Sequence, residues 1–348
     1  MSRIQRVDER LRYLAKPPLE TVEQVRLGPN DVLILCAGFE ERSIEVLRQV
    51  VANSCRNLRV VEINYLPEIH ENRHSEVLEL CRSAGYLVES VTYDRRDPGG
   101  GGDEIARRSR GAKGSIYIDV SGMSRLLIVQ LLAAIGRRPD GYSGVKLFYA
   151  EALNYPPTEA EVETALPESG EDWVGSIMFL SSGVFGVTIV PKLSSTAMQG
   201  QPLRLVAFPT FNTAQLVALR MEISASEYSI VNGLPPSPEN AWRLQAIRKL
   251  NYVENIPRRE ELTVSTLDYR DTLNLLLEIY GRNSDRQKLI VSPTGSKMQA
   301  VATGLLRGFL DDIEVAYPTP VTFEPPERYS MGVRNLYVLD LQPFCQLS

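Results

Sequence analysis

Histidine and cysteine are scarce in this sequence, and their scarcity narrows the chemistry that it supports. Its 348 residues include two histidines and four cysteines, and no pair of cysteines has the C-x-x-C spacing typical of zinc and redox motifs. A disulfide framework or a structural zinc site is therefore not expected, whereas a reduced, cytoplasmic setting is. General acid–base catalysis by histidine also has few candidates.

Long apolar runs and an excess of positive charge are missing as well. The longest apolar run, residues 126–135, is interrupted by Gln130 and is too short for the roughly 20 residues that cross a bilayer. The first 18 residues are charged and contain no apolar signal core. The net charge is −5, which argues against general binding to nucleic-acid polymers. We therefore expect a cytoplasmic protein without membrane association.

What is present is an internal repeat. The segment DVLILCAGFEERSIEVLRQV, which begins at Asp31, has the same layout as LRLVAFPTFNTAQLVALRMEI, which begins at Leu203. Later segments match in the same order, including SIYIDVSGMSRLLIVQLLAAI with KLIVSPTGSKMQAVATGLL. In this alignment Asn64 matches Asn232, and Arg125 matches Lys297. Because the agreement extends over five elements, we interpret the chain as a duplication.

Each copy alternates apolar strands with helices, and the strands are continuous apolar runs, as in sheets covered on both faces. The fold class predicted is α/β, with two tandem Rossmann-like domains, each a mainly parallel sheet flanked by helices. We expect an N-terminal helix and lead-in over residues 1–30, a first domain over 31–182, a linker over 183–202 and a second domain over 203–348. The last strands of the two copies are expected at residues 174–182 and 334–342.

The turn after the fourth strand of each copy is a candidate anion site. DVSGMSR (119–125) and SPTGSK (292–297) both place small hydroxyl residues and glycine where a helix begins. The N-terminus of a helix offers unpaired N–H groups and the positive end of the helix dipole, and Arg125 or Lys297 would add a full charge. We therefore predict a phosphate contact there. The alternative is ordinary helix capping by Ser121 or Thr294.

Other candidates lie at the carboxyl ends of neighbouring strands, where open α/β sheets bind their ligands. The turn AGFEERS (37–43) follows the first strand, and two matched asparagines lie in the second strands. Neither G-x-G-x-x-G nor G-x-x-x-x-G-K-[ST] occurs, so we expect no classical dinucleotide or ATP site and no resident cofactor. The predicted ligand-binding residues are Gly38, Arg42, Asn64, Ser121, Gly122, Ser124, Arg125, Asn232, Ser292, Thr294, Gly295, Ser296 and Lys297.

The two histidines spell H-E-x-x-H with Glu71 between them, at His70 and His74. That pattern binds zinc when it lies on a stable helix with a third ligand. The matching segment of the second copy, PSPENAWR, has no histidine, so we expect a polar helix start on a surface loop and no metal site. No Ser-His-Asp order, G-x-S-x-G elbow or catalytic cysteine pattern is present. We therefore assign no catalytic residue and do not expect an enzyme.

The pattern Asp119-x-Ser121-x-x-x-Arg125 resembles the post-strand motif of CRISPR-associated Rossmann-fold (CARF) domains. TGSKM (294–298) is similar to the Thr-Gly-rich-Lys turn of the same family. The resemblance implies binding of a linear or cyclic oligonucleotide second messenger, in a two-lobed site lined by the two turns. The two copies together account for the given sequence and leave no residues for an effector domain. The resemblance therefore further implies a sensor that acts with a separate effector protein in prokaryotic antiviral defence. A homodimer is also compatible with this family.

Three alternatives remain open from the sequence. A protein of this fold could be a slow, metal-independent phosphodiesterase that cleaves the bound messenger. It could be a scaffold in which the repeated turns are only capped helices. The least favoured alternative is a metallohydrolase that uses the H-E-x-x-H pattern.

Overall fold

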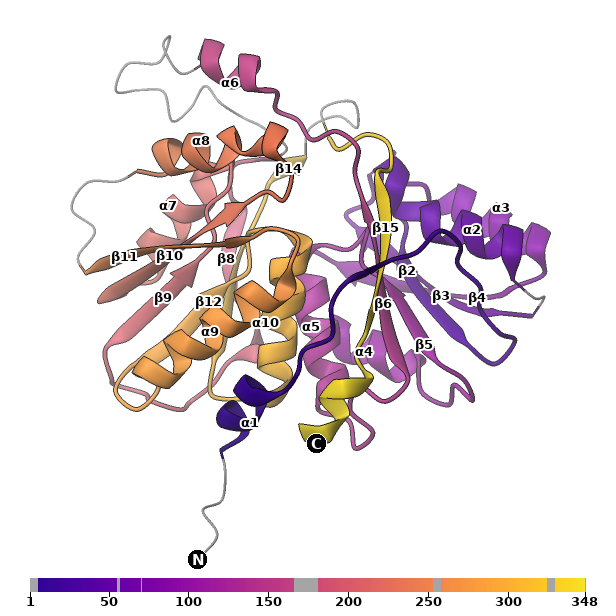
Figure 1. Ribbon diagram of the computed structural model, residues 1–348, viewed down its shortest axis with the longest axis horizontal. Helices are drawn as coiled ribbons and strands as arrows, with labels where there is room; N and C mark the ends of the chain where they lie inside the picture. Colours follow the sequence, from indigo (N-terminus) through magenta and orange to yellow (C-terminus); the bar gives the residue numbers. More distant parts are fainter. Residues whose placement is uncertain are drawn as a thin grey trace, which may run out of the picture. The chain divides into compact units, whose positions relative to one another are not determined.

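A computed structural model describes residues 6–54, 57–69, 71–165, 181–252, 258–323 and 329–347. It is an α/β protein with two mainly parallel sheets, one of seven and one of six strands, each flanked by helices (Figure 1). The chain divides into two compact units, Met1–Tyr155 with Tyr329–Ser348 and Pro156–Arg328, which we call unit 1 and unit 2. The predicted fold class is confirmed.

The elements of unit 1 follow one another along the chain as alternating strands and helices, closed by a strand from the C-terminal segment. They are α1 (Val7–Tyr13), β1 (Glu20–Thr21), β2 (Val32–Cys36), η1 (Glu41–Ile44), α2 (Glu45–Asn53), β3 (Arg59–Leu66), α3 (His74–Ala84), β4 (Leu87–Asp94), α4 (Gly101–Arg108), β5 (Ile116–Asp119), α5 (Arg125–Gly136), β6 (Val145–Glu151), β15 (Asn335–Asp340) and η6 (Gln342–Leu347).

Unit 2 repeats the alternation. Its elements are α6 (Glu159–Ala165), β7 (Ser181–Ser182), β8 (Gly186–Ile189), η3 (Pro191–Leu193), β9 (Leu203–Ala207), α7 (Thr213–Glu222), β10 (Glu227–Leu234), η4 (Pro238–Asn240), α8 (Trp242–Leu250), β11 (Arg259–Ser265), α9 (Tyr269–Asn283), β12 (Lys288–Ser292), α10 (Lys297–Phe309), β13 (Glu314–Thr319) and β14 (Thr322–Phe323).

Both sheets have the same strand order. In unit 1 the parallel strands lie in the order β6-β5-β2-β3-β4, and in unit 2 in the order β13-β12-β9-β10-β11. Counted along the chain, each is a fifth-fourth-first-second-third arrangement, so the connections reverse direction between the first and the fourth strand. This is the Rossmann-like topological switch point, beyond which open sheets bind ligands.

The strands form because their residues are apolar throughout and both faces of each sheet are covered. All five residues of β2, VLILC, are buried. Residues of α2 and α3 pack on one face of the first sheet with Leu33, Leu35 and Val60. On the other face α4 and α5 approach so closely that a Cβ on Gly102 would lie 2.5 Å from the backbone of Gln130. A larger residue at position 102 would separate the two helices.

The sixth strand of each sheet lies in a different place from the one expected. β15, at the end of the chain, pairs antiparallel with β6 in unit 1, with Leu339 opposite Leu147. β8, from the expected linker, pairs antiparallel with β13 in unit 2, with Ile189 opposite Ala316. The boundaries 31–182 and 203–348 therefore need correction. Residues 335–340, expected in the second domain, belong to the sheet of unit 1, and residues 186–189, expected in the linker, belong to the sheet of unit 2.

The strand expected at residues 174–182 lies mostly outside the described residues, which leave out 174–180. Residues 181–182 form β7, which pairs with β14 in unit 2. His70 is also outside the described residues. No helix in the described ranges is long and apolar enough to cross a membrane.

Candidate functional site

The switch point of unit 2 is formed by the turns after β9 and β12. The second of these turns is a capped helix start: Ser296 is the N-cap of α10, its N–H donates to Gln299 Oε1 at 2.7 Å, and Gln299 N–H donates to Ser296 Oγ at 3.1 Å. This reciprocal capping box satisfies two of the N–H groups that a helix start leaves unpaired. The capping alternative is thus confirmed for this turn, with Ser296 as the cap rather than Thr294.

The remaining hydroxyl groups of the turn fasten it to neighbouring loops. Thr294 Oγ1 donates to the carbonyl oxygen of Phe208 at 2.6 Å, and Ser296 Oγ donates to that of Thr266, also at 2.6 Å. Phe208 follows β9, and Thr266 follows β11. Thr294 and Ser296 therefore position the turn across the carboxyl edge of the sheet, a structural role that the sequence did not assign to them.

Gly295 makes room for the Gln299 side chain among these turns, and Gly233 lies next to it. A Cβ on Gly295 would be 2.1 Å from Gln299 Oε1, and a Cβ on Gly233 would be 3.6 Å from Gln299 Nε2. Gly233 belongs to β10, so the amide of Gln299 spans the space between the ends of β10 and β12. A side chain at position 295 would displace this amide.

Several polar atoms at this edge are buried without a hydrogen-bond partner among the described residues. They are Gln299 Nε2, Asn232 Nδ2 and Ser292 Oγ, on side chains that are at most 2% exposed. A buried polar group without a partner costs about 1–3 kcal/mol, so native structures seldom keep several together without a use for them. These three atoms, at the carboxyl edge of the second sheet and beside the N-terminus of α10, are therefore available for hydrogen bonds to a ligand.

In unit 1 the equivalent turn, after β5, is also a helix cap. Ser124 is the N-cap of α5 and its Oγ accepts from Leu127 N–H at 3.3 Å, while its own N–H donates to Tyr65 Oη at 2.5 Å. Ser121 Oγ accepts the N–H of Ala150 at 2.8 Å and is fully buried. Both serines are thus used within unit 1, and the cap is Ser124 rather than Ser121.

The turns after β2 and β5 touch because Gly122 has no side chain. A Cβ on Gly122 would lie 2.2 Å from the carbonyl oxygen of Cys36, and one on Gly38 would lie 3.4 Å from Ser43 Cβ. Ser43 Oγ donates to the Gly38 carbonyl oxygen at 3.0 Å. The predicted Gly38 and Gly122 are thus brought together, since a Cβ on Gly38 would lie 3.5 Å from Gly122 Cα.

Arg42 lies in η1, just after the turn that follows β2, and its guanidinium is hydrogen-bonded to residues of unit 1. Its guanidinium donates to both carboxylate oxygens of Glu40 at 3.1 Å, to the Ala150 carbonyl oxygen at 3.0 Å and to Tyr149 Oη at 3.3 Å. Burial alone would lower the pKa of Arg42, but the Glu40 carboxylate and the nearby phenols outweigh it and raise that pKa. Ser330 also hydrogen-bonds Glu40. Arg42, predicted to bind a ligand, is therefore the centre of an internal cluster.

A pair of ionisable side chains on unit 1, Glu62 and His74, was not apparent from the sequence. The Glu62 carboxyl group, whose side chain is fully buried in β3, lies with Oε1 2.6 Å from His74 Nδ1 at the start of α3. The His74 side chain is 33% exposed, so Glu62 orients an imidazole that solvent can reach. The residues are 12 apart in sequence and meet only because α3 packs on β3.

This arrangement bears on the H-E-x-x-H pattern. α3 begins at His74, and Glu71 lies in the turn before it, so these two residues do not share a helix as a zinc site of that type requires. His70 is outside the described residues. Within the described part of the chain, no group of three or more histidine, cysteine or acidic side chains could hold a metal ion.

Arg125 and Lys297 hold the same place in the two units. Each is the first residue of its helix, α5 or α10, and each is half-buried. Asn64 and Asn232 likewise lie one strand along from the switch point, in β3 and β10; Asn64 is half-buried and Asn232 is buried. The structure thus distributes the predicted residues over two carboxyl edges, seven in unit 1 and six in unit 2.

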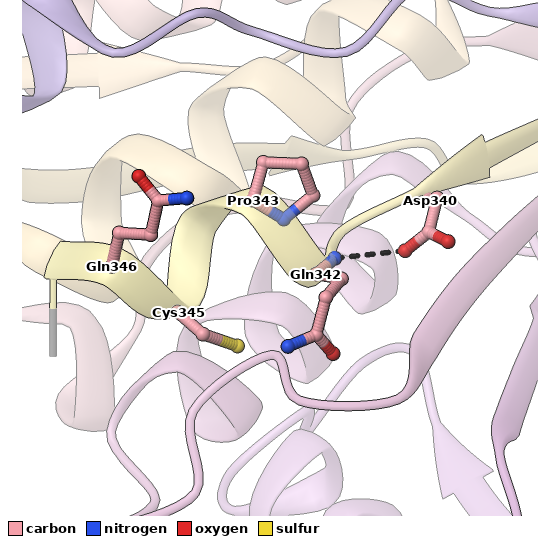
Figure 2. Close-up of a pocket in the computed structure, with 5 residues that line it drawn as sticks. All are labelled: Asp340, Gln342, Pro343, Cys345 and Gln346. Carbon is pink, nitrogen blue, oxygen red and sulfur yellow. Dashed lines mark hydrogen bonds between the residues drawn. The ribbon is translucent and has the colours of Figure 1, made fainter.

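An open cavity of about 470 Å³ lies elsewhere on unit 1, next to η6 (Figure 2). Gln342 N–H donates to Asp340 Oδ1 at 2.9 Å in its wall. β15 runs antiparallel to β6, so its end lies at the amino edge of the sheet, opposite the switch point. The cavity is therefore separate from the predicted site. Its lining residues are Asp340, Gln342, Pro343, Cys345 and Gln346.

Comparison with known proteins yields little for this chain. No protein-family model matches the sequence, and no curated protein matches it. Among solved structures, the cytoplasmic domain of a prokaryotic cation chloride cotransporter is similar over 83% of this chain and 95% of that one, at 10% identity and a TM-score of 0.24. A likeness this weak supports no inference about the present chain.

Proposed function

We propose that this protein binds a phosphate-containing ligand of the nucleotide or oligonucleotide type at the carboxyl edges of its Rossmann-like sheets. The observation that carries the proposal is a set of buried polar atoms on Asn232, Ser292 and Gln299, beside the N-terminus of α10, that have no hydrogen-bond partner among the described residues. A phosphate oxygen would accept hydrogen bonds from such groups. The adjacent helix dipole would favour its negative charge.

Two further features support this ligand class. The strand order places both turns at a topological switch point, the usual ligand position in open α/β sheets. Arg125 and Lys297 begin the helices there and supply one positive charge in each unit. The CARF-like pattern of these turns favours an oligonucleotide messenger. A sensor that works with a separate effector in the cytoplasm remains part of the proposal.

A specific observation favours a second candidate, metal-independent cleavage of the bound phosphodiester. His74 is oriented by buried Glu62, as an imidazole that transfers a proton commonly is. Turnover of a bound cyclic dinucleotide that stops in His74→Gln would support this activity. Intact ligand recovered after prolonged incubation would exclude it and leave binding alone.

The binding proposal is tested by calorimetry and thermal unfolding with inorganic phosphate, AMP and cyclic di-AMP. A ligand that binds only the folded state raises the melting temperature by mass action. We expect a rise with at least one nucleotide, and its loss in the double variant Arg125→Ala/Lys297→Ala. If no probe binds the wild-type protein, the proposal is wrong and the two turns are only capped helices of a scaffold.

A further inference from the structure

The two units differ in the charge buried at their carboxyl edges, and this difference deepens the proposed function, on which the following inference rests. We infer that unit 2 alone holds the phosphate of the ligand, through Asn232, Gln299 and the start of α10, and that the matching edge of unit 1 does not accept an anion.

The first argument concerns acidic side chains. Asp119, which ends β5 and is 1% exposed, lies six residues before Arg125, whereas the residue six before Lys297 is Val291 in β12. Glu62, fully buried, lies two residues before Asn64 and on the same face of β3, whereas the residue two before Asn232 is Ile230. Unit 1 therefore buries two carboxyl groups near its switch point at positions where unit 2 has two alkyl groups. Like charge disfavours an incoming phosphate.

The buried cation Arg42 does not reverse this difference, because its guanidinium donates to both carboxylate oxygens of Glu40. Arg125 and Lys297 begin the matching helices of the two units, so they do not distinguish the two edges. In unit 2 the buried polar groups of Ser292, Asn232 and Gln299 are neutral, so they place no negative charge beside the positive end of the α10 dipole.

The second argument concerns donors. The third residue of α10 is Gln299, whose Oε1 caps the helix while Nε2 has no partner among the described residues. The third residue of α5 is Leu127, a fully buried alkyl side chain. Unit 1 therefore lacks the amide donor that unit 2 presents between the ends of β10 and β12. Amide N–H groups donate and cannot accept, so they select an acceptor such as a phosphate oxygen.

Two conservative variants test this assignment in the full-length chain. Gln299→Glu keeps the oxygen that accepts Ser296 N–H, and glutamate suits a capping box, but it replaces the free donor by a charged acceptor. Asn232→Asp makes the same change on β10. With AMP and cyclic di-AMP as probes, we expect each variant to lose about tenfold or more in affinity, because an acceptor then faces the phosphate. Adenosine, which has no phosphate, should show no such difference.

The matched control is Gln342→Glu at the amino edge of unit 1. Its Oε1 also accepts a backbone N–H, that of Gly144 at 2.9 Å, so the chemical change is the same far from either switch point. This variant should bind both probes as the wild type does. Melting temperatures identify any variant that fails to fold, and Asn232→Asp carries the test if Gln299→Glu does not fold.

The possible failures are distinguishable. If no phosphate-bearing probe binds the wild type, the proposed function and this inference fail together. If Gln299→Glu and Asn232→Asp bind normally while Asn64→Asp loses affinity, the ligand lies in unit 1 and only the inference is overturned. If the two unit 2 variants weaken adenosine as much as AMP, the edge recognises the nucleoside and not the phosphate, which also overturns it.

Discussion

Unit 1 and unit 2 share a strand order and the position of a helix start, yet they fill the same edge of the sheet with opposite kinds of polar group. Unit 1 buries ionisable groups, such as Arg42 paired with Glu40, and Glu62, whose Oε2 has no hydrogen-bond partner among the described residues. Unit 2 buries neutral amides, and Asn232 Nδ2 and Gln299 Nε2 likewise have no partner in the described part of the chain. A duplicated fold thus keeps its backbone while its polar filling diverges, so function must be read from each edge separately.

The largest expected effect concerns the charged filling of unit 1. Arg42→Met would leave the Glu40 carboxylate buried without its main partner, since both side chains are at most 10% exposed. We expect the free energy of unfolding of unit 1 to fall by about 3–5 kcal/mol, measured by urea denaturation. The double variant Glu40→Gln/Arg42→Met should recover part of this loss. A single variant within about 1 kcal/mol of the wild type would show that the pair is not needed.

The next effect compares the turn glycines. In Gly122→Ala the new Cβ would lie 2.2 Å from a backbone oxygen, that of Cys36, whereas in Gly295→Ala its nearest atom would be the end of the Gln299 side chain. Backbone cannot move aside as a side chain can, so we expect Gly122→Ala to cost about 1–3 kcal/mol and Gly295→Ala to cost less. Gly100→Ala, with open space around it, is the control. Equal losses at positions 122 and 295 would contradict the comparison.

A smaller effect comes from one change made at two fully buried serines. Ser121 Oγ accepts the N–H of Ala150, whereas Ser292 Oγ has no partner among the described residues. Ser121→Ala should therefore cost about 1–2 kcal/mol of stability by leaving an N–H unpaired, and Ser292→Ala should be close to neutral. Thermal unfolding measures both. Destabilisation by Ser292→Ala alone would mean that its hydroxyl is bonded in the protein.

The smallest effect depends on pH. Burial tends to raise the pKa of Asp268, but hydrogen bonds from Arg270 outweigh it and lower that pKa. Because the folded-state pKa is depressed, the stabilisation is present above the unfolded-state value, near 4, and is lost as the pH falls through the folded-state value. Asp268→Ala should thus cost about 1 kcal/mol at pH 7, as the loss of the N-cap of α9.

The comparison with Asp94, which ends β4 and begins no helix, sharpens this prediction. Asp94→Ala should cost less than Asp268→Ala at pH 7, and the difference should shrink towards pH 3. A cost for Asp268→Ala that stays constant across this range would indicate that the carboxyl group contributes by packing rather than by charge.

The sequence predicted the fold well because its signals are local. Continuous apolar strands such as VLILC and the repeated order of elements determine an α/β duplication. The position of β15 in the sheet of unit 1 could not be predicted from such local signals. RNLYVLDLQ was recognisable as a strand, but its pairing with β6 in unit 1 joins residues nearly two hundred positions apart, and no local pattern encodes that partner.

The candidate sites were predictable to a similar depth. The turns beyond the strands were identified because parallel strands bring their carboxyl ends to one edge. The Glu62–His74 pair was missed because it depends on how α3 packs on β3. Gln299 was also missed, although a sequence signal for it exists. Ser296 and Gln299 form the S-x-x-Q capping-box pattern, which can be recognised in the sequence and points to that amide.

The position of β15 after unit 2 in the sequence has a consequence for co-translational folding. Every residue of unit 2 is synthesised before β15, the antiparallel strand that lies beside β6 in unit 1. Domains generally fold as units while synthesis proceeds. Unit 2, which is encoded second, can thus be completed first, whereas the sheet of unit 1 keeps an open edge at β6 until β15 has been synthesised.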